Sequence, residues 1–192
     1  MLTASKILEE LNNEKIGIYP FDVKNLNPNS YNVRLSPTLM IYDIDPLTPL
    51  DPNKHNPTKT ITIPEEGYIL QPGVLYLGST KEIISSDYYI SAIDGRSSIG
   101  RLGISIHATA GFGDVGFKGT YTLEISCIHP VKIYPNMLIA QIHFTEPCGD
   151  VDFLYRGRYY EQILPTESRM FMNESQLSDG YHYKKGDKND NK

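Results

Sequence analysis

The chain of 192 residues has few cysteines and no long apolar run, and each absence narrows what the protein can be. Its only cysteines, Cys127 and Cys148, do not form a C-x-x-C pair. This disfavours a zinc or redox motif, and we expect two reduced thiols. No run of about 18 apolar residues occurs, so we expect no transmembrane helix. Glu9 and Glu10 stand where a signal peptide would need its apolar core, which favours a cytoplasmic protein.

Positive charge is also not in excess. The formal net charge of −5 disfavours binding to duplex nucleic acid or to an anionic membrane, which would need a basic surface. It leaves room for a local basic pocket that takes a small phosphorylated ligand. The apolar fraction of 40% and charged fraction of 21% are typical of a globular protein with a sizeable core.

Helical periodicity is confined to the N-terminus. Residues 3–13 are expected to form a helix with an apolar stripe of Ile7, Leu8 and Leu11, and Thr3 or Ser5 can cap its start. Short β-type runs separated by turn residues follow, which predicts a mostly β sandwich or barrel of the jelly-roll kind. The expected strands are 30–35, 38–42, 60–63, 68–70, 74–79, 88–93, 104–108, 121–126, 131–133 and 138–144.

We expect a single domain over residues 1–174, because no linker divides the chain. From about residue 175 the sequence is polar and ends in K-K-G-D-K-N-D-N-K. Residues 175–192 are therefore predicted to be a disordered, solvated tail, and contact of its lysines with nucleic acid is the less favoured interpretation.

The segment 94–125 breaks local rules for strands, because it places glycines, arginines and acids between short β-type runs. Such a segment is a candidate functional site. In R-S-S-I-G-R at 96–101, two arginines and two serine hydroxyls suit a polyphosphate. The alternative is a loop whose arginines pair with Asp94 or Asp114. The G-K-[ST] ending of a Walker loop is missing.

The glycine-rich stretch A-G-F-G-D-V-G-F at 110–117 allows close approach of the backbone to a ligand. Asp114 could accept a hydrogen bond from a sugar hydroxyl or orient a water, or it could form an Asx-turn. Phe112 and Phe117 could stack on a base or fill the end of a barrel.

Strand alternation in T-Y-T-L-E-I at 120–125 places Tyr121, Leu123 and Ile125 on one face and Thr122 and Glu124 on the other. A glutamate in such a strand is either solvent-facing or functional. In a pocket, Glu124 could move a proton.

These motifs resemble those of the dCTP deaminases in the trimeric dUTPase superfamily. The resemblance covers about residues 1–170 and comprises G-R-S-S-I-G-R-L-G, T-A-G-F-G-D-V-G-F-K-G and T-L-E in the central segment, N-P-N-S-Y-N-V-R-L at 27–35, P-N-M-L-I-A-Q at 135–141 and Y-R-G-R-Y-Y-E-Q-I-L-P-T-E-S-R at 155–169.

The resemblance implies a distorted β-barrel or jelly-roll trimer with active sites at subunit interfaces. It implies hydrolysis of the 4-amino group of dCTP without a catalytic metal, with Mg²⁺ carried by the triphosphate. The H-x-E motif of zinc deaminases is absent, since Ala108 and Thr109 follow His107. No zinc, nucleic acid or membrane partner is expected.

By the same resemblance, Glu124 is the proton shuttle, while Arg101, Ser97 and the carbonyl of Ala110 position the water and the amino group. Asp114 reads the 3′-hydroxyl, and residues 155–170 form a lid over the triphosphate. The expected substrate-binding residues are Arg96, Ser97, Ser98, Ile99, Gly100, Arg101, Asp114, Thr122, Leu123, Glu124, Gln141, Tyr155, Arg158 and Gln162.

Two departures from the family pattern are Asn32 in place of aspartate, which we treat as structural, and Arg158 in place of lysine, which keeps the charge. Gly111-Phe112 and Gly100 resemble the family members that also cleave the triphosphate, releasing dUMP for thymidylate synthesis. The hypothesis is that small Gly111 leaves room for a second water near the α-phosphate, with Asp114 beside it. A deaminase that stops at dUTP, a plain dUTPase and a non-catalytic nucleotide sensor are the alternatives.

Overall fold

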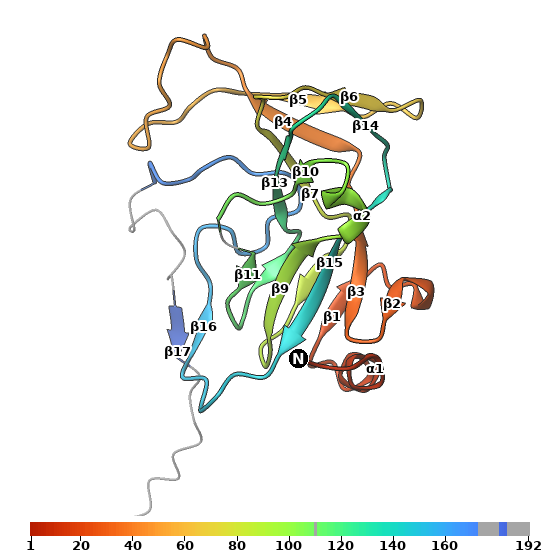
Figure 1. The fold of residues 1–192 in the computed structure, drawn as a ribbon. Coiled ribbons are helices and arrows are strands. Elements are labelled where there is room, and N and C mark those ends of the chain that lie inside the picture. Colours follow the sequence, from red (N-terminus) through yellow and green to blue (C-terminus); the bar gives the residue numbers. More distant parts are fainter. Residues whose placement is uncertain (110, 173–180, 184–192) are drawn as a thin grey trace, which may run out of the picture.

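A computed structural model describes residues 1–109, 111–172 and 181–183. Short antiparallel strands are its main regular structure, and helix α1 (Ala4–Asn12) lies at one side (Figure 1). Ile7 in α1 is fully buried and Leu11 packs on the core, so these two residues of the predicted apolar stripe face inward, whereas Leu8 is partly exposed. Thr3 occupies the N-cap position, but its side chain makes no capping hydrogen bond.

Two five-stranded antiparallel sheets form the body of the molecule. The first has the order β11 (Phe112–Gly113), β9 (Ile90–Gly95), β15 (Leu138–Thr145), β3 (Ser30–Arg34) and β2 (Leu26–Asn27). The second has the order β10 (Ile104–Ser105), β13 (Thr122–Cys127), β7 (Tyr76–Ser79), β4 (Thr38–Tyr42) and β5 (Thr58–Thr62). The mostly β architecture predicted from the sequence is confirmed.

Among the described residues, three smaller sheets and two short helices complete the fold. A three-stranded sheet has the order β1 (Gly17–Tyr19), β8 (Ile83–Ser85) and β12 (Lys118–Gly119). The two-stranded sheets pair β6 (Tyr68–Leu70) with β14 (Val131–Ile133), and β16 (Phe153–Tyr155) with β17 (Tyr181–Tyr183). The short helices are the 3₁₀-helix η1 (Val23–Asn25) and α2 (Ser97–Gly100).

Several sequence expectations need correction. Residues 97–100, for which a loop was the alternative interpretation, form the one-turn helix α2, and the strand expected at 104–108 ends after Ser105. The short strands β1, β8, β12 and β16 were not expected. Each has only two or three residues. Such strands carry too little periodicity to be recognised, and their partners decide whether they form.

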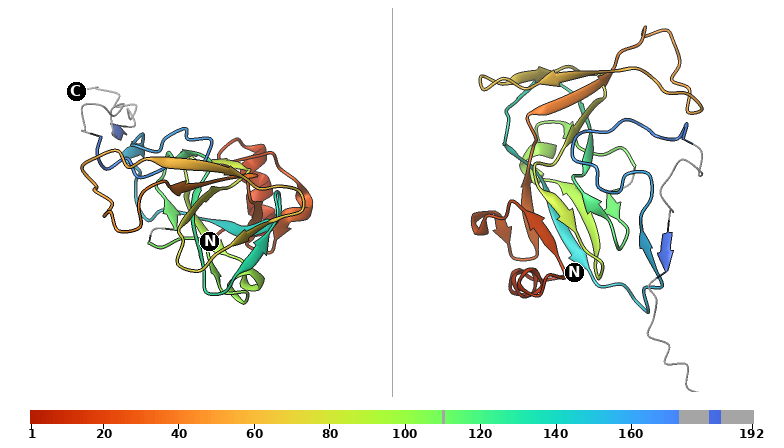
Figure 2. Two further views of the ribbon diagram at one scale, coloured as in Figure 1. Left: turned by 90° about the horizontal axis from the view of Figure 1, so that it is seen from above. Right: turned by 180° about the vertical axis from the view of Figure 1, so that it is seen from behind.

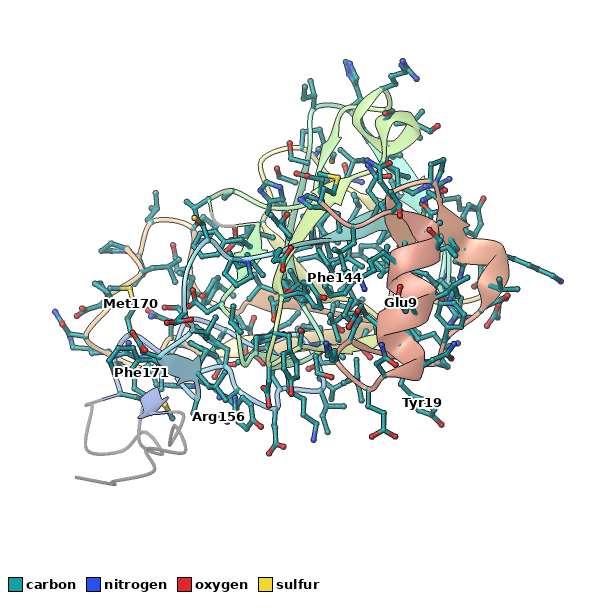
Figure 3. The ribbon with its side chains drawn as sticks, turned by 90° about the horizontal axis from the view of Figure 1, so that it is seen from below. Glu9, Tyr19, Phe144, Arg156, Met170 and Phe171 are labelled. Carbon is teal, nitrogen blue, oxygen red and sulfur yellow. The ribbon has the colours of Figure 1, made fainter. Side chains whose placement is uncertain are left out.

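The core lies between the two large sheets, and Phe144 of β15 is near its centre (Figure 3). Strand β13 shows the predicted alternation: Leu123, Ile125 and Cys127 are buried, while Thr122 and Glu124 are partly exposed. The fully buried carboxylate of Glu82 pairs with Arg34, whose backbone N–H and guanidinium donate to it at 2.8 and 2.6 Å. That pairing satisfies the buried charge.

The C-terminal segment 155–172 returns across the molecule beside the loop 43–57 (Figures 1 and 2). Residues 181–183, in the predicted tail, form β17 and do not follow the expectation of a tail without structure. The other tail residues lie outside the described part of the chain. None of the described helices is long and apolar enough to span a bilayer.

Candidate active site

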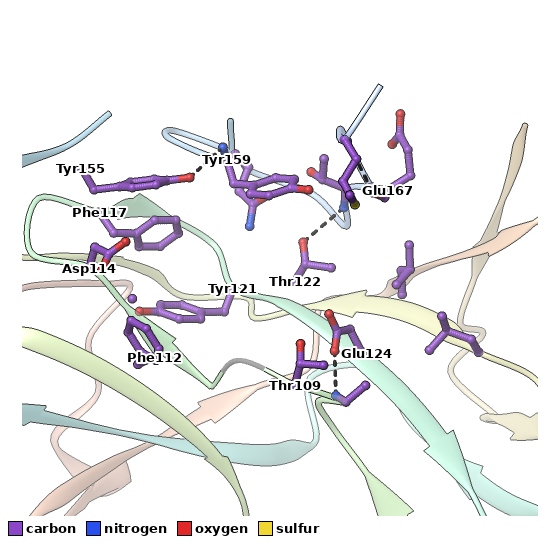
Figure 4. A pocket seen from close by; sticks show the side chains of 18 of the residues that line it. Thr109, Phe112, Asp114, Phe117, Tyr121, Thr122, Glu124, Tyr155, Tyr159 and Glu167 are labelled. Atoms are coloured by element: carbon purple, nitrogen blue, oxygen red, sulfur yellow. Dashed lines mark hydrogen bonds between the residues drawn. The ribbon is translucent and has the colours of Figure 1, made fainter. Parts of the chain in front are cut away.

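A pocket of about 540 Å³ opens between β13, β7, the turn after β11 and the C-terminal segment (Figure 4). The residues that line it are Tyr42, Leu75, Leu77, Ala108, Thr109, Phe112, Gly113, Asp114, Phe117, Tyr121, Thr122, Glu124, Tyr155, Tyr159, Gln162, Thr166, Glu167, Ser168 and Met170. Its size is in the range of pockets that hold small ligands, and it combines apolar walls with a few polar groups.

Glu124 supplies the carboxylate at one end of this pocket (Figure 4). Strand alternation turns it away from the core, and its Oε2 accepts a hydrogen bond of 2.6 Å from the backbone N–H of Ala108. Leu77, its partner residue on β7, and Leu75 form an apolar wall beside it. A carboxylate held in this way next to an apolar wall can exchange protons with a planar ring that lies on the wall.

Aromatic rings fill the other end of the pocket. Phe117 packs between Tyr121, at a centroid distance of 4.9 Å, and Tyr155, at 6.1 Å. Phe112, in the same part of the pocket, is 60% exposed, and Asp114 is an exposed carboxylate near Phe117 (Figure 4). Burial raises the pKa of the Tyr121 hydroxyl, so this group stays neutral at physiological pH.

The C-terminal segment forms the roof of the pocket. The Gln162 amide donates to the carbonyl of Thr120 at 2.7 Å, and the Thr120 N–H donates back to the Gln162 carbonyl at 2.9 Å. The N–H of Thr166 donates to the Thr122 hydroxyl, and that of Ser168 donates to the Tyr42 hydroxyl, both at 3.3 Å. The predicted lid therefore lies over the pocket of its own chain.

The structure brings only some of the predicted site residues into this pocket. Asp114, Thr122, Glu124, Tyr155 and Gln162 line it, together with Phe112. Ala110 lies outside the described residues. The side chains of Ile99 and Leu123 are buried in the core, so only their backbones can meet a ligand.

The R-S-S-I-G-R residues lie elsewhere. Gly100 and Arg101 line a second depression together with Leu102, Gly103 and residues 128–132. Figure 1 places α2 on the side of the sheets away from the C-terminal segment. One chain alone therefore does not bring Arg101 to Glu124.

Two alternatives to a binding role were ion pairs of the arginines with Asp94 or Asp114 and an Asx-turn at Asp114. Neither is seen in the described part of the chain. Arg96 donates to the carbonyl of Leu138 at 3.2 Å, and no ion pair joins Arg96 or Arg101 to Asp94 or Asp114. Asp94 instead approaches His107 at 3.6 Å. No hydrogen bond reaches the Asp114 carboxylate among the described residues, so the Asx-turn reading gains no support.

Three further predicted residues lie outside the pocket lining. Gln141 of β15 stands opposite Asn32 and Asp94. One guanidinium nitrogen of Arg158 donates to the carbonyl of Met172 at 3.4 Å, while its buried Nε has no partner among the described residues. A Cβ on Gly111 would meet the carbonyl oxygen of Ile93 at 2.7 Å. The space beside Gly111 thus faces β9, and the hypothesis of a second water there gains no support from the pocket.

Sequence reasoning missed several lining residues. Leu75, Leu77 and Tyr42 come from strands that were predicted without any functional role. Thr166, Glu167 and Ser168 belong to the P-T-E-S-R motif. This motif contributed to the family resemblance, but we assigned no role to its residues. Tyr121 was assigned only to a strand face. Among the described residues, no three His, Cys, Asp or Glu side chains group closely enough to hold a metal ion.

Comparisons with known proteins agree with the sequence motifs. A family model described as dCTP deaminase-like matches residues 1–146. Two proteins named "dCTP deaminase, dUMP-forming", from Clostridium beijerinckii and Leptospira biflexa, are each 48% identical over 159 residues, or 83% of this chain. The match covers 90% of the first relative and 89% of the second.

The fold is also found in a solved structure. The 2′-deoxycytidine 5′-triphosphate deaminase from Agrobacterium tumefaciens superposes with a TM-score of 0.60 at 19% identity, over 81% of this chain. The match spans half the length of that protein, and at this identity it bears on the fold alone. The family model and the two relatives show common ancestry, and the chain therefore belongs to the dCTP deaminase-like family.

Proposed function

We propose that this protein hydrolyses dCTP to dUTP and ammonia and then cleaves dUTP to dUMP and pyrophosphate. The observation that carries the proposal is Glu124, held by the N–H of Ala108 at the end of a ligand-sized pocket. The names of the two relatives at 48% identity support the dUMP-forming activity. A cytoplasmic location fits an enzyme that acts on free nucleotides.

In the proposed deamination, Glu124 takes a proton from water as the hydroxide adds to C4 of cytosine. Glu124 gives this proton to N3 of the ring, then takes the proton of the hydroxyl added at C4 and passes it to the amino group, and ammonia leaves as the C4 carbonyl of dUTP forms. The N–H of Ala108 occupies Oε2 and thereby fixes the direction of the other carboxylate oxygen. Leu75 and Leu77 form an apolar wall against which the base can lie.

The sugar and phosphates would extend from the base toward the aromatic end and the roof. Asp114 is exposed in the pocket, and its free carboxylate suits a bond to the 3′-hydroxyl. Tyr155 and Gln162 belong to the roof, where Arg158, whose Nε lacks a partner in the described part, can turn to a phosphate. The roof excludes water, which strengthens each charge interaction beneath it.

The remaining phosphate and water contacts would come from a second subunit. Arg96, Ser97, Ser98 and Arg101 are outside the pocket of their own chain, so we propose a homotrimer in which α2 of one subunit completes the pocket of the next. Mg²⁺ would enter with the triphosphate and neutralise its charge.

In the proposed second step, a water attacks the α-phosphorus of dUTP and pyrophosphate leaves, with Asp114 as the candidate group to orient that water. Phe112, rather than Gly111, is the member of the Gly-Phe pair that lines the pocket. We therefore propose that Phe112 shapes this part of the site.

The test is to incubate the purified protein with dCTP and Mg²⁺ and to separate the products over time. The proposal expects dUMP, pyrophosphate and ammonia to appear together. Accumulation of dUTP with ammonia would reduce the activity to deamination alone. Cleavage of added dUTP without any turnover of dCTP would make the protein a plain dUTPase, and no turnover of either would favour a nucleotide sensor.

A further inference from the structure

Gly113 and Tyr121 stand at the two ends of the segment 113–121, which carries Asp114 and Phe117 into the pocket. A Cβ on Gly113 would collide with the Tyr121 hydroxyl and come within 3.0 Å of the Ser91 hydroxyl. Real Cβ atoms do not tolerate such contacts. The tip of the Tyr121 ring therefore occupies the room that the missing side chain of Gly113 leaves, and the ring closes the base of the segment.

Tyr121 is held at both its backbone and its hydroxyl. Its N–H donates to the Thr80 hydroxyl at 2.9 Å, and its carbonyl accepts from the Thr80 N–H at 2.9 Å. Its hydroxyl forms a buried hydrogen bond with Ser91, the residue of β9 that lies directly opposite Gly113. Tyr121 and Ser91 are only 8% and 4% exposed, so water cannot replace this bond.

The fixed ring supports the aromatic end of the pocket. Phe117 packs on Tyr121 with a ring-centroid distance of 4.9 Å. Its other side packs on Tyr155 of the C-terminal segment, at a centroid distance of 6.1 Å (Figure 4). Asp114 lies in the turn between Gly113 and Phe117, and both ends of that turn touch Tyr121. The position of the Asp114 carboxylate thus depends on where the Tyr121 ring lies.

We propose that Tyr121, together with Ser91 and Gly113, is a positioning residue that holds Asp114 and Phe117 in place as the sugar wall of the pocket and so sets the preference for a deoxyribonucleotide. This rests on the proposed function, in which Asp114 meets the sugar. Tyr121 acts through these two residues and needs no contact of its own with the reacting atoms.

The first variant is Tyr121→Phe, which keeps the ring and removes its bond to Ser91. We expect KM for dCTP to rise on the order of three- to tenfold with kcat changed less than about twofold, because without the bond to Ser91 the ring holds Asp114 and Phe117 less firmly against the substrate. The ratio of kcat/KM for dCTP over CTP should shrink, since a displaced Asp114 reads the sugar less well.

The second measurement is the coupling between the two positions. Gly113→Ala places a methyl group against the Tyr121 hydroxyl, so it should raise KM more in the parent than in the Tyr121→Phe background, where that oxygen is gone. A Gly113→Ala effect that is the same in both backgrounds contradicts the proposal.

Tyr76→Phe is the matched control. Tyr76 is also a buried tyrosine, and its hydroxyl accepts a hydrogen bond of 3.1 Å from the N–H of Gln71, but it does not line the pocket. Its loss should lower the melting temperature as Tyr121→Phe does and leave KM and the dCTP/CTP ratio unchanged. If Tyr121→Phe behaves like Tyr76→Phe, its role is structural only and the inference is overturned.

Amide hydrogen exchange separates this inference from the proposed function. Faster exchange of residues 112–118 in Tyr121→Phe than in Tyr76→Phe is expected whatever the protein turns over. If the parent lacks dCTP activity, the proposed function fails and so does the role in sugar preference, whatever the exchange shows. If the parent is active while KM, the dCTP/CTP ratio and exchange do not move in Tyr121→Phe, the inference alone fails.

Discussion

At the scale of single residues, Glu124 is the group on which the proposed chemistry depends. Its neighbours on β13 point into the core, whereas Glu124 points into the pocket and keeps one hydrogen bond, from Ala108. A neutral amide at this position can still accept that bond but cannot carry a proton between water and the ring. Shape and chemistry can therefore be separated by one substitution.

Glu124→Gln is predicted to lower kcat for ammonia release from dCTP by about 10²- to 10⁴-fold, the usual contribution of a general acid–base group. Release of ammonia, followed in a coupled assay, checks this. Glu66→Gln, at an exposed turn outside the pocket, is the control and should leave the rate unchanged. Retention of full deaminase activity in Glu124→Gln would remove the residue from the mechanism.

At the scale of elements, the C-terminal segment is the part that covers the pocket. Its hydrogen bonds reach three places in or next to the second large sheet. These are Tyr42 at the end of β4, Thr122 at the start of β13, and Thr120 two residues before it. The segment covers the pocket through these single hydrogen bonds and through the packing of Tyr155 on Phe117. Such contacts are individually weak, which suits a lid that must open.

Gln162→Ala tests this roof. It removes the 2.7 Å bond to the Thr120 carbonyl, and we expect KM for dCTP to rise on the order of tenfold because the roof closes less well. The neighbouring Glu161→Gln breaks only an exposed 3.2 Å ion pair with Lys118 and should change KM little. Equal KM values for the two variants would show that the roof plays no part in binding.

Helix α1 carries the clearest pH dependence of folding. A hydrogen bond from Lys6 is the main cause that lowers the pKa of the buried Glu10 carboxyl below its usual 4.5. Because the folded state holds the lower pKa, this contribution to stability is present above pH 4.5 and is lost as the pH falls through the folded value.

Glu10→Gln is therefore predicted to lower the melting temperature at neutral pH, with the difference from the parent closing as the pH falls to about 3. Thermal unfolding monitored by circular dichroism between about pH 3 and 7 measures this. The control is Glu9→Gln, whose side chain is 57% exposed and also pairs with Lys6. A gap between parent and Glu10→Gln that stays constant with pH would contradict the assignment.

At the scale of the whole molecule, the two halves of the expected site lie apart. Glu124 and Asp114 line the pocket, while Arg101 lies at the second depression, beside Leu102 and Ile128, which are 53% and 73% exposed. An interface between subunits would cover these exposed apolar groups and the arginine that lies outside the pocket of its own chain. The proposed trimer accounts for both observations at once.

Mixing two inactive variants tests this arrangement. The two variants, Glu124→Gln and Arg101→Ala, are refolded together in equal amounts. If Glu124 and Arg101 of one site come from different subunits, about a quarter of the sites should contain both intact residues, and about a quarter of the parent activity should return. If both residues of a site come from one subunit, no site is complete and activity stays absent. Light scattering of the parent should give three times the mass of a single chain.

Much of the fold could be read from periodicity, which is local. The strands at 38–42, 68–70 and 131–133 were predicted to the residue, and the alternation in β13 separated Leu123 from Glu124 correctly. The very short strands and α2 were not predictable, because two to four residues hold no period and take their conformation from their neighbours.

The sequence alone determined the family, the mostly β class and which face of β13 carries the carboxylate, because motifs and a two-residue period are properties of consecutive residues. Tertiary structure alone decided that Ser168 meets Tyr42, that Tyr121 fills the room beside Gly113, and that Arg101 leaves the pocket of its own chain. These contacts join residues distant in sequence or depend on how closely a side chain fits its neighbours. A pattern of consecutive residues does not contain either kind of information.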